Sequence, residues 1–98
     1  MISDIDSSLN NKFVTIAGRI YNTKKLYRKS DNAAMCKFTL EDMTGNVEAI
    51  CYTKTYAQYK NAVNEGEIVK IRGRVITDDT GAGTSLQINV QEIETLVA

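Results

Sequence analysis

Cationic and aromatic side chains are concentrated in one stretch of the sequence, between positions 19 and 37. The candidates for ligand binding in this stretch are Arg19, Tyr21, Lys24, Lys25, Tyr27, Arg28, Lys29 and Lys37. Ammonium and guanidinium groups displace the counterions that surround phosphates, and a tyrosine ring can stack on an unpaired base for about 1–3 kcal/mol. These residue types therefore predict contact with a single-stranded nucleic acid. The alternative is a solvated, charged strand edge on which both tyrosines pack against their neighbours.

The charges of the chain are unevenly distributed, although their sum is zero. Residues 12–40 contain seven cationic side chains and one acidic side chain, Asp31, and so carry +6. The other 69 residues contain five cationic and eleven acidic side chains, and so carry −6. We therefore expect a dipolar molecule with one basic face.

The sequence offers no set of residues for catalysis or for metal binding. It contains no histidine, so no nucleophile–base pair can be assembled around one. Glu41 and Asp42 are adjacent, and adjacent side chains on a strand point to opposite faces, so the two carboxylates cannot converge on one ligand. Cys36 and Cys51 alone would leave a zinc site short of ligands. We expect a non-catalytic domain without metal or cofactor, in which both cysteines are buried and reduced.

Alternation of apolar and polar residues with period two predicts five β-strands that would position the cationic stretch. They cover residues 12–28, 34–41, 46–52, 67–77 and 85–92. The segment DDTGAGT, residues 78–84, is expected to be a flexible loop between the last two strands, because its glycines and aspartates favour turns.

Two helical segments are expected besides the strands. Apolar residues at i, i+3 and i+7 within TYAQYKNAV predict a helix over residues 54–63, with Thr53 as its N-cap. Near the start of the chain, Ser3 and Asp6 resemble a capping box, which predicts a short helical turn that covers the core.

The hairpin of the second and third strands has a predicted register. If the apolar residues of both strands face the core, the position numbers of paired residues sum to 87, which places Cys36 opposite Cys51. This register implies a four-residue loop, 42–45, with Gly45 in the left-handed region. A three-residue loop would instead bury Glu48, at a large desolvation cost.

Three strands, one helix and two further strands in fewer than 100 residues are the arrangement of the OB-fold. We therefore expect an all-β protein: a five-stranded Greek-key barrel with one helix between strands three and four and a short N-terminal helical turn. A chain of this length has room for one core, so residues 1–98 should form a single domain. OB-folds bind ligands on the face of strands two and three and on the flanking loops, where the cationic stretch would lie.

Four blocks in this order resemble the OB domain of bacterial DNA polymerase III alpha subunits, within the anticodon-binding-like group: FVTIAGRI, KFTLEDMTGNVEAICY, TYAQYKNAV and EGEIVKIRGRV. The resemblance implies a module of a longer polymerase subunit that positions single-stranded template during replication, with the catalytic carboxylates elsewhere. It implies single-stranded DNA, with RNA as a possibility, and other domains or subunits of the polymerase as partners. The chain departs from the family twice, because KSDNAA (residues 29–34) lacks a glycine and Cys51 replaces an aliphatic residue.

Two other functions fit the same residues. One is an RNA-directed OB domain, such as the anticodon-binding domain of a class II aminoacyl-tRNA synthetase. The other is a protein-interaction module whose outer face binds a partner or a neighbouring domain. Competition between single-stranded DNA and RNA would separate the DNA-binding module from the RNA-directed domain. A flat salt dependence would favour the protein-interaction module.

The sequence also predicts where the domain resides. No apolar run approaches the roughly 20 residues of a membrane span. The first residues, MISDIDSSLN, lack the features of a secretory signal, and two cysteines are too few for a disulfide scaffold. We therefore expect a soluble, cytoplasmic domain that does not bind membranes.

Overall fold

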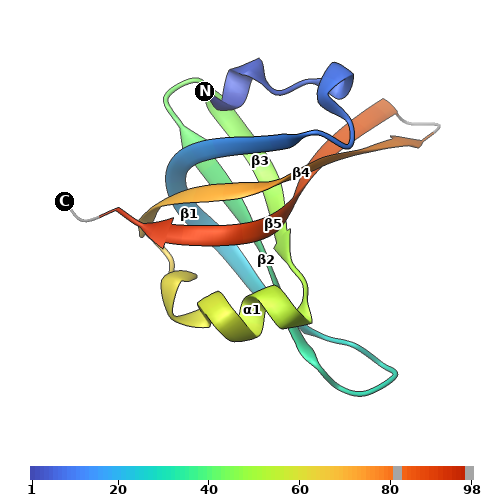
Figure 1. The fold of residues 1–98 in the computed structure, drawn as a ribbon, viewed down its shortest axis with the longest axis vertical. Helices are drawn as coiled ribbons and strands as arrows, with labels where there is room; N and C mark the ends of the chain where they lie inside the picture. The colour runs from blue at the N-terminus through green and yellow to red at the C-terminus, as the bar shows by residue number, and fades with distance from the viewer. Residues whose placement is uncertain (81–82, 97–98) are drawn as a thin grey trace.

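The computed structural model describes residues 1–80 and 83–96, in which five strands form a closed barrel (Figure 1). In chain order the strands are β1 (Phe13–Tyr27), β2 (Ala34–Asp42), β3 (Gly45–Cys51), β4 (Ile68–Thr80) and β5 (Gly83–Thr95). Their order around the barrel is β1-β2-β3-β5-β4, and β1 closes the ring by pairing with both β2 and β4. β3 and β5 run parallel and share three residue pairs, whereas the other neighbours are antiparallel. The predicted OB-fold barrel is confirmed.

The core of the barrel follows from the alternation of side chains along the strands. In β1, Ile16, Gly18 and Ile20 are buried and the two residues between them are exposed. In β2, Phe38 and Leu40 are fully buried, so both belong to the core. Burial of apolar surface stabilises a fold by about 25 cal/mol per Å², so this continuous interior is the main source of the barrel's stability.

The β2–β3 hairpin has the predicted register. Cys36 lies opposite Cys51, and both are buried and free. Burial raises the pKa of the Cys51 thiol to about 12, so at neutral pH this residue is a small apolar group and not a nucleophile. Strand pairing extends to Asp42 and Gly45, however, so the connection has two residues and the predicted four-residue loop is wrong.

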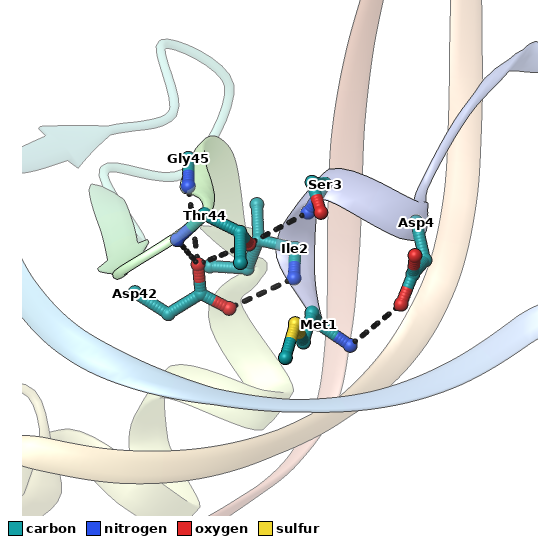
Figure 2. Close-up of polar contacts among 7 residues, drawn as sticks. All are labelled: Met1, Ile2, Ser3, Asp4, Asp42, Thr44 and Gly45. Atoms are coloured by element: carbon teal, nitrogen blue, oxygen red, sulfur yellow. Dashed lines mark hydrogen bonds and ion pairs between the residues drawn. The ribbon is translucent and has the colours of Figure 1, made fainter.

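The side chain of Asp42 organises this turn (Figure 2). Its carboxylate accepts hydrogen bonds from the backbone N–H of Ile2 at 2.9 Å, of Thr44 at 2.7 Å and of Gly45 at 3.1 Å, and from the Thr44 hydroxyl at 2.6 Å. These bonds, that of Ile2 first, lower the pKa of Asp42 to about 2. The expectation of a left-handed Gly45 is also wrong, since among the described residues the glycines with positive φ are Gly66 and Gly83.

Helical segments lie at opposite ends of the barrel (Figure 1). At one end are the 3₁₀ turns η1 (Ile2–Asp4) and η2 (Ser7–Leu9). The Ser3 capping box is wrong, because Asp6 is itself the N-cap of η2 and accepts the N–H of Ser8.

At the other end, between β3 and β4, lies α1 (Thr53–Tyr59), followed by η3 (Lys60–Ala62). The predicted helix is therefore confirmed in place but is divided in two. The N-cap is Tyr52, not Thr53. The Thr53 hydroxyl is instead buried without a hydrogen-bond partner among the described residues.

The β4–β5 hairpin is longer than the sequence predicts. Residues 78–84 are not all loop, because backbone pairing continues through Asp78–Ser85 and Asp79–Thr84 to Thr80–Gly83. Gly81, the other glycine of the predicted loop, lies outside the described residues. The two strands project as an arm beyond the barrel (Figure 1), and this arm forms one wall of the candidate site.

Candidate nucleic-acid interface

A β-bulge in β1 decides which way the cationic side chains point. The pairing of β1 with β2 shifts between Tyr21, which lies opposite Thr39, and Lys24, which lies opposite Lys37. The two residues in between, Asn22 and Thr23, therefore face a single residue of β2, and Asn22 has a φ of 56°. Asparagine tolerates this left-handed conformation better than most residues. The alternation of side chains moves by one position at the bulge.

Glu65 stabilises the bulge. Its carboxylate accepts the backbone N–H groups of Asn22 at 3.1 Å and Thr23 at 2.8 Å. Hydrogen bonds from the side chain and the backbone of Thr23, and from the backbone of Asn22, lower the pKa of Glu65. A negative charge thus binds the N–H groups that the interrupted ladder leaves free.

The bulge divides the predicted site residues between two faces. Lys24 shares the outer face with its partner Lys37 and, across the bulge, with Tyr21. Lys25 lies opposite the buried Cys36, and Tyr27 opposite Ala34, so these two project on the inward-facing side of the ladder. They are exposed because the β1–β2 hairpin extends past the core. The Lys25 ammonium lies 5.7 Å from the centroid of the Tyr27 ring.

The loop after β1 is held by an ion pair. The Arg28 guanidinium donates to both carboxylate oxygens of Asp31, at 3.1 and 2.6 Å, which offsets its charge. Lys29 is exposed in the same loop. Asn32 has a φ of 59°, so an asparagine supplies the left-handed position of this loop.

Acidic groups restrict the basic region of the outer face to the side of Lys24 and Lys37. Arg19 lies opposite Glu41, and a hydrogen bond to the Glu41 carboxylate raises the pKa of Tyr21. Glu48 accepts a hydrogen bond from the Thr39 hydroxyl at 3.0 Å. Tyr21 is therefore already engaged with a carboxylate, and Arg19 lies opposite the same acidic residue.

A groove of about 520 Å³ runs between the outer face of β2–β3 and the β4–β5 arm. Its lining residues come from four strands: Lys37, Glu48, Ile76, Thr77, Ser85, Leu86 and Gln87. The floor is mixed apolar and polar, with Lys37 at the β2 side. The sequence analysis did not predict that residues of the β4–β5 arm line this groove. The two consecutive apolar residues Val75 and Ile76 interrupt the alternation of β4 and could have indicated an apolar side chain on its outer face.

Other site types find no support in the described residues. In this part of the chain no group of three or more histidine, cysteine or acidic side chains could hold a metal ion. Across residues 1–80 and 83–96, no helix is both long and apolar enough to span a membrane.

Comparison with protein families and curated sequences gives consistent results. A family model described as an OB-fold nucleic acid binding domain matches residues 14–96. The chain is 29% identical over 82 residues to DNA polymerase III subunit alpha of Halalkalibacterium halodurans, which covers 84% of the chain and 7% of the relative. It is 34% identical over 74 residues to an error-prone DNA polymerase of Sinorhizobium medicae, covering 74% and 6%. The chain thus spans 6–7% of the length of these relatives.

Solved structures share the fold at low sequence identity. The second single-stranded DNA binding protein of Mycobacterium smegmatis matches with a TM-score of 0.71 and 19% identity, covering 85% of this chain and 84% of that one. A mitochondrial single-stranded DNA binding protein of S. cerevisiae matches with a TM-score of 0.69 and 16% identity, covering 89% and 97%. Asparaginyl-tRNA synthetase of Pyrococcus horikoshii matches with 0.68 and 20%, covering 98% and 21%.

Proposed function

The chain belongs to the family of OB-fold nucleic acid binding domains, and we propose that it binds single-stranded DNA as a non-catalytic module of a bacterial DNA polymerase III alpha subunit. In this proposal residues 1–98 are one domain of a longer cytoplasmic protein, whose other domains or subunits are its protein partners and carry the catalytic residues. The module holds the template strand near them during replication. The likeness to the alpha subunits of Halalkalibacterium halodurans and Borreliella burgdorferi supports this context; the second is 28% identical over 65 residues, 66% of the chain and 6% of the relative.

The observation that carries single-strand binding is the groove between the outer face of β2–β3 and the β4–β5 arm. Lys37 lines this groove, and Lys24 on β1 lies directly opposite Lys37, so two ammonium groups flank one side of the groove. Cationic side chains along a groove supply sequence-independent affinity for a phosphate backbone. The apolar side chains of Ile76 and Leu86 offer bases a contact surface on the other side.

The remaining candidates receive secondary roles. Tyr27 is 54% exposed, so its ring is free to stack on a base, and Lys25 beside it can reach the adjacent phosphate. Lys29 extends the basic surface into the loop. Arg28 would have to exchange Asp31 for a phosphate, and Tyr21 would have to give up its hydrogen bond to Glu41. Arg19 lies opposite Glu41, whose negative charge would repel a phosphate. The lysines therefore carry most of the proposed phosphate binding.

Fluorescence anisotropy with a labelled oligothymidylate, titrated at several salt concentrations, tests the proposal. Affinity for the single strand should exceed affinity for duplex, and its logarithm should fall linearly with the logarithm of salt concentration. Lys37→Ala should reduce the slope by about 0.7, the value for one phosphate contact on a single strand. Lys60→Ala removes the same charge from the exposed η3 segment and should leave the slope unchanged.

Two results would contradict the proposal. Absence of single-strand binding by the wild type at low salt would favour a protein-interaction module. Equal effects of Lys37→Ala and Lys60→Ala would mean that the groove is not the site.

The likeness to the fold of a tRNA synthetase supports RNA as the second candidate ligand. A competing RNA oligonucleotide that displaces DNA at lower concentration than unlabelled DNA would select it.

A further inference from the structure

An exposed aromatic ring on the β1–β4 side of the barrel holds two arginines. Phe13 is 46% exposed at the start of β1. The guanidinium carbons of Arg72 and Arg74, both on β4, lie 4.7 and 4.9 Å from the centroid of its ring. An aromatic ring orders a guanidinium by cation–π attraction while its N–H groups stay free for other acceptors.

The two arginines are not neutralised by the protein. Within the part of the chain that the structure describes, neither forms an ion pair, although Glu92 lies directly opposite Arg72. Arg74 lies opposite Asn89, which carries no charge. By contrast, Lys70 on the same strand pairs with Glu94 at 3.0 Å. Arg72 and Arg74 therefore keep their positive charges, whereas the charge of Lys70 is offset by Glu94.

The strand register connects this cluster with the proposed groove. Directly paired residues form one row on the outward-facing side of the sheet, in which Ile50 is buried: Lys24, Lys37, Ile50, Asn89, Arg74 and Phe13. Three steps between neighbouring strands, at roughly 4.8 Å each, separate Lys37 from Arg74 by about 14 Å. Only neutral residues lie between the two cations in this row, so nothing in it repels a phosphate backbone.

We propose that Phe13, Arg72 and Arg74 form a second contact site for the same single strand, on which the guanidinium groups bind phosphates and the ring lies beside a base. The site deepens the proposed function and rests on it. Guanidinium groups bind phosphate oxygens in a bidentate fashion, and a ring that fixes both of them lowers the entropy lost on binding. The bound single-stranded DNA leaves the groove, crosses β3 and β5, and reaches β4 and β1. A path of this length is within the ~4–16 nucleotides that one OB fold covers.

A single tryptophan tests this path directly. The sequence contains no tryptophan, so Phe13→Trp introduces a unique fluorophore, and tryptophan keeps the cation–π contact. Addition of an oligothymidylate of about 12 nucleotides should quench its emission with the midpoint that anisotropy gives for the same variant. Met43→Trp, at a fully exposed position in the turn between β2 and β3, is the control and should not be quenched.

The two proposals fail in different ways. If anisotropy shows binding while Phe13→Trp emission does not change, the second site is refuted and the groove stands. If neither signal changes, the proposed function itself fails.

As a second measurement, Arg72→Ala with Arg74→Ala should reduce the salt slope by about 1.4, for two phosphates. Lys54→Ala with Lys60→Ala, a loss of the same charge at α1 and η3, should not reduce it. Equal slopes for the two double variants would also overturn the second site.

Discussion

Gly18 lies where β1 changes partners, and its replacement by alanine is expected to destabilise the barrel strongly. β1 pairs with β4 up to Arg19 and with β2 from Arg19 onward, so the strand bends sharply at this point. A Cβ at Gly18 would lie 2.5 Å from the backbone oxygen of Glu41, where ordinary contacts begin near 3.4 Å. Relief of this contact requires β1 and β2 to separate by close to 1 Å, because a backbone atom cannot rotate away. Overpacking of this kind costs about 1–3 kcal/mol.

The matched control is Gly45→Ala. A Cβ at Gly45 would meet only Ile2, at 4.0 Å, and its φ is not positive. For a domain of this size, 1 kcal/mol lowers Tm by about 4–8 °C, so Gly18→Ala should lower Tm by at least about 4 °C and Gly45→Ala by much less. Thermal melts followed by circular dichroism measure both. If Gly18→Ala melts with the wild type, or if Gly45→Ala is the more damaging change, the assigned geometry of the two glycines is incorrect.

Three further predictions concern the β2–β3 turn, the β-bulge in β1 and the exposed ring of Tyr27. The folded-state pKa of Asp42, about 2, lies below its ordinary value of 3.8, so its stabilising effect is complete above pH 4 and is lost as pH falls from about 4 to 2. Asp42→Asn should therefore lower Tm at pH 7 and flatten the acid decline; parallel pH profiles would contradict this. Glu65→Ala should weaken single-strand binding, because Asn22 and Thr23 lose the acceptor that holds the bulge. Charge alone predicts the opposite, so tighter binding by anisotropy would refute the role of the bulge. Tyr27→Ala should cost about 1–3 kcal/mol of binding while the salt slope stays unchanged, because stacking releases no counterions; a changed slope would mean that Tyr27 positions a lysine.

The strands were predictable because burial on one face imposes period two on the sequence. Cys36 and Cys51 were placed opposite each other from this pattern alone, since a slip by one residue would have buried Glu48. The shape of the turn was not predictable in the same way. One of the hydrogen bonds that hold Asp42 comes from the backbone N–H of Ile2, 40 residues away in the sequence. Tertiary contacts of this kind leave no local signal.

The candidate site was predictable in composition but not in orientation. Lys24 and Lys25 appear as one basic pair in the sequence, whereas the bulge directs them to different faces. Asn22, in the middle of an otherwise regular strand, was the available sign, since asparagine often adopts positive φ. The stacking of Arg72 on Phe13 joins two residues that are 59 positions apart (72 − 13), and the pairing of β1 with β4 brings them together.

The parallel pairing of β3 with β5 gives the barrel a region of low local stability beneath its proposed ligand. These strands share three residue pairs, and one of them, Glu48 with Gln87, lies in the groove. Local opening starts where few hydrogen bonds hold two elements together, so amide hydrogens of this pairing should exchange sooner than those of the long β4–β5 ladder. A DNA strand bound across the groove would contact both β3 and β5 and would oppose their separation. Single-stranded DNA would then slow exchange most at the amides of β3 and β5, and the closure of the barrel and the occupancy of the groove would be thermodynamically linked.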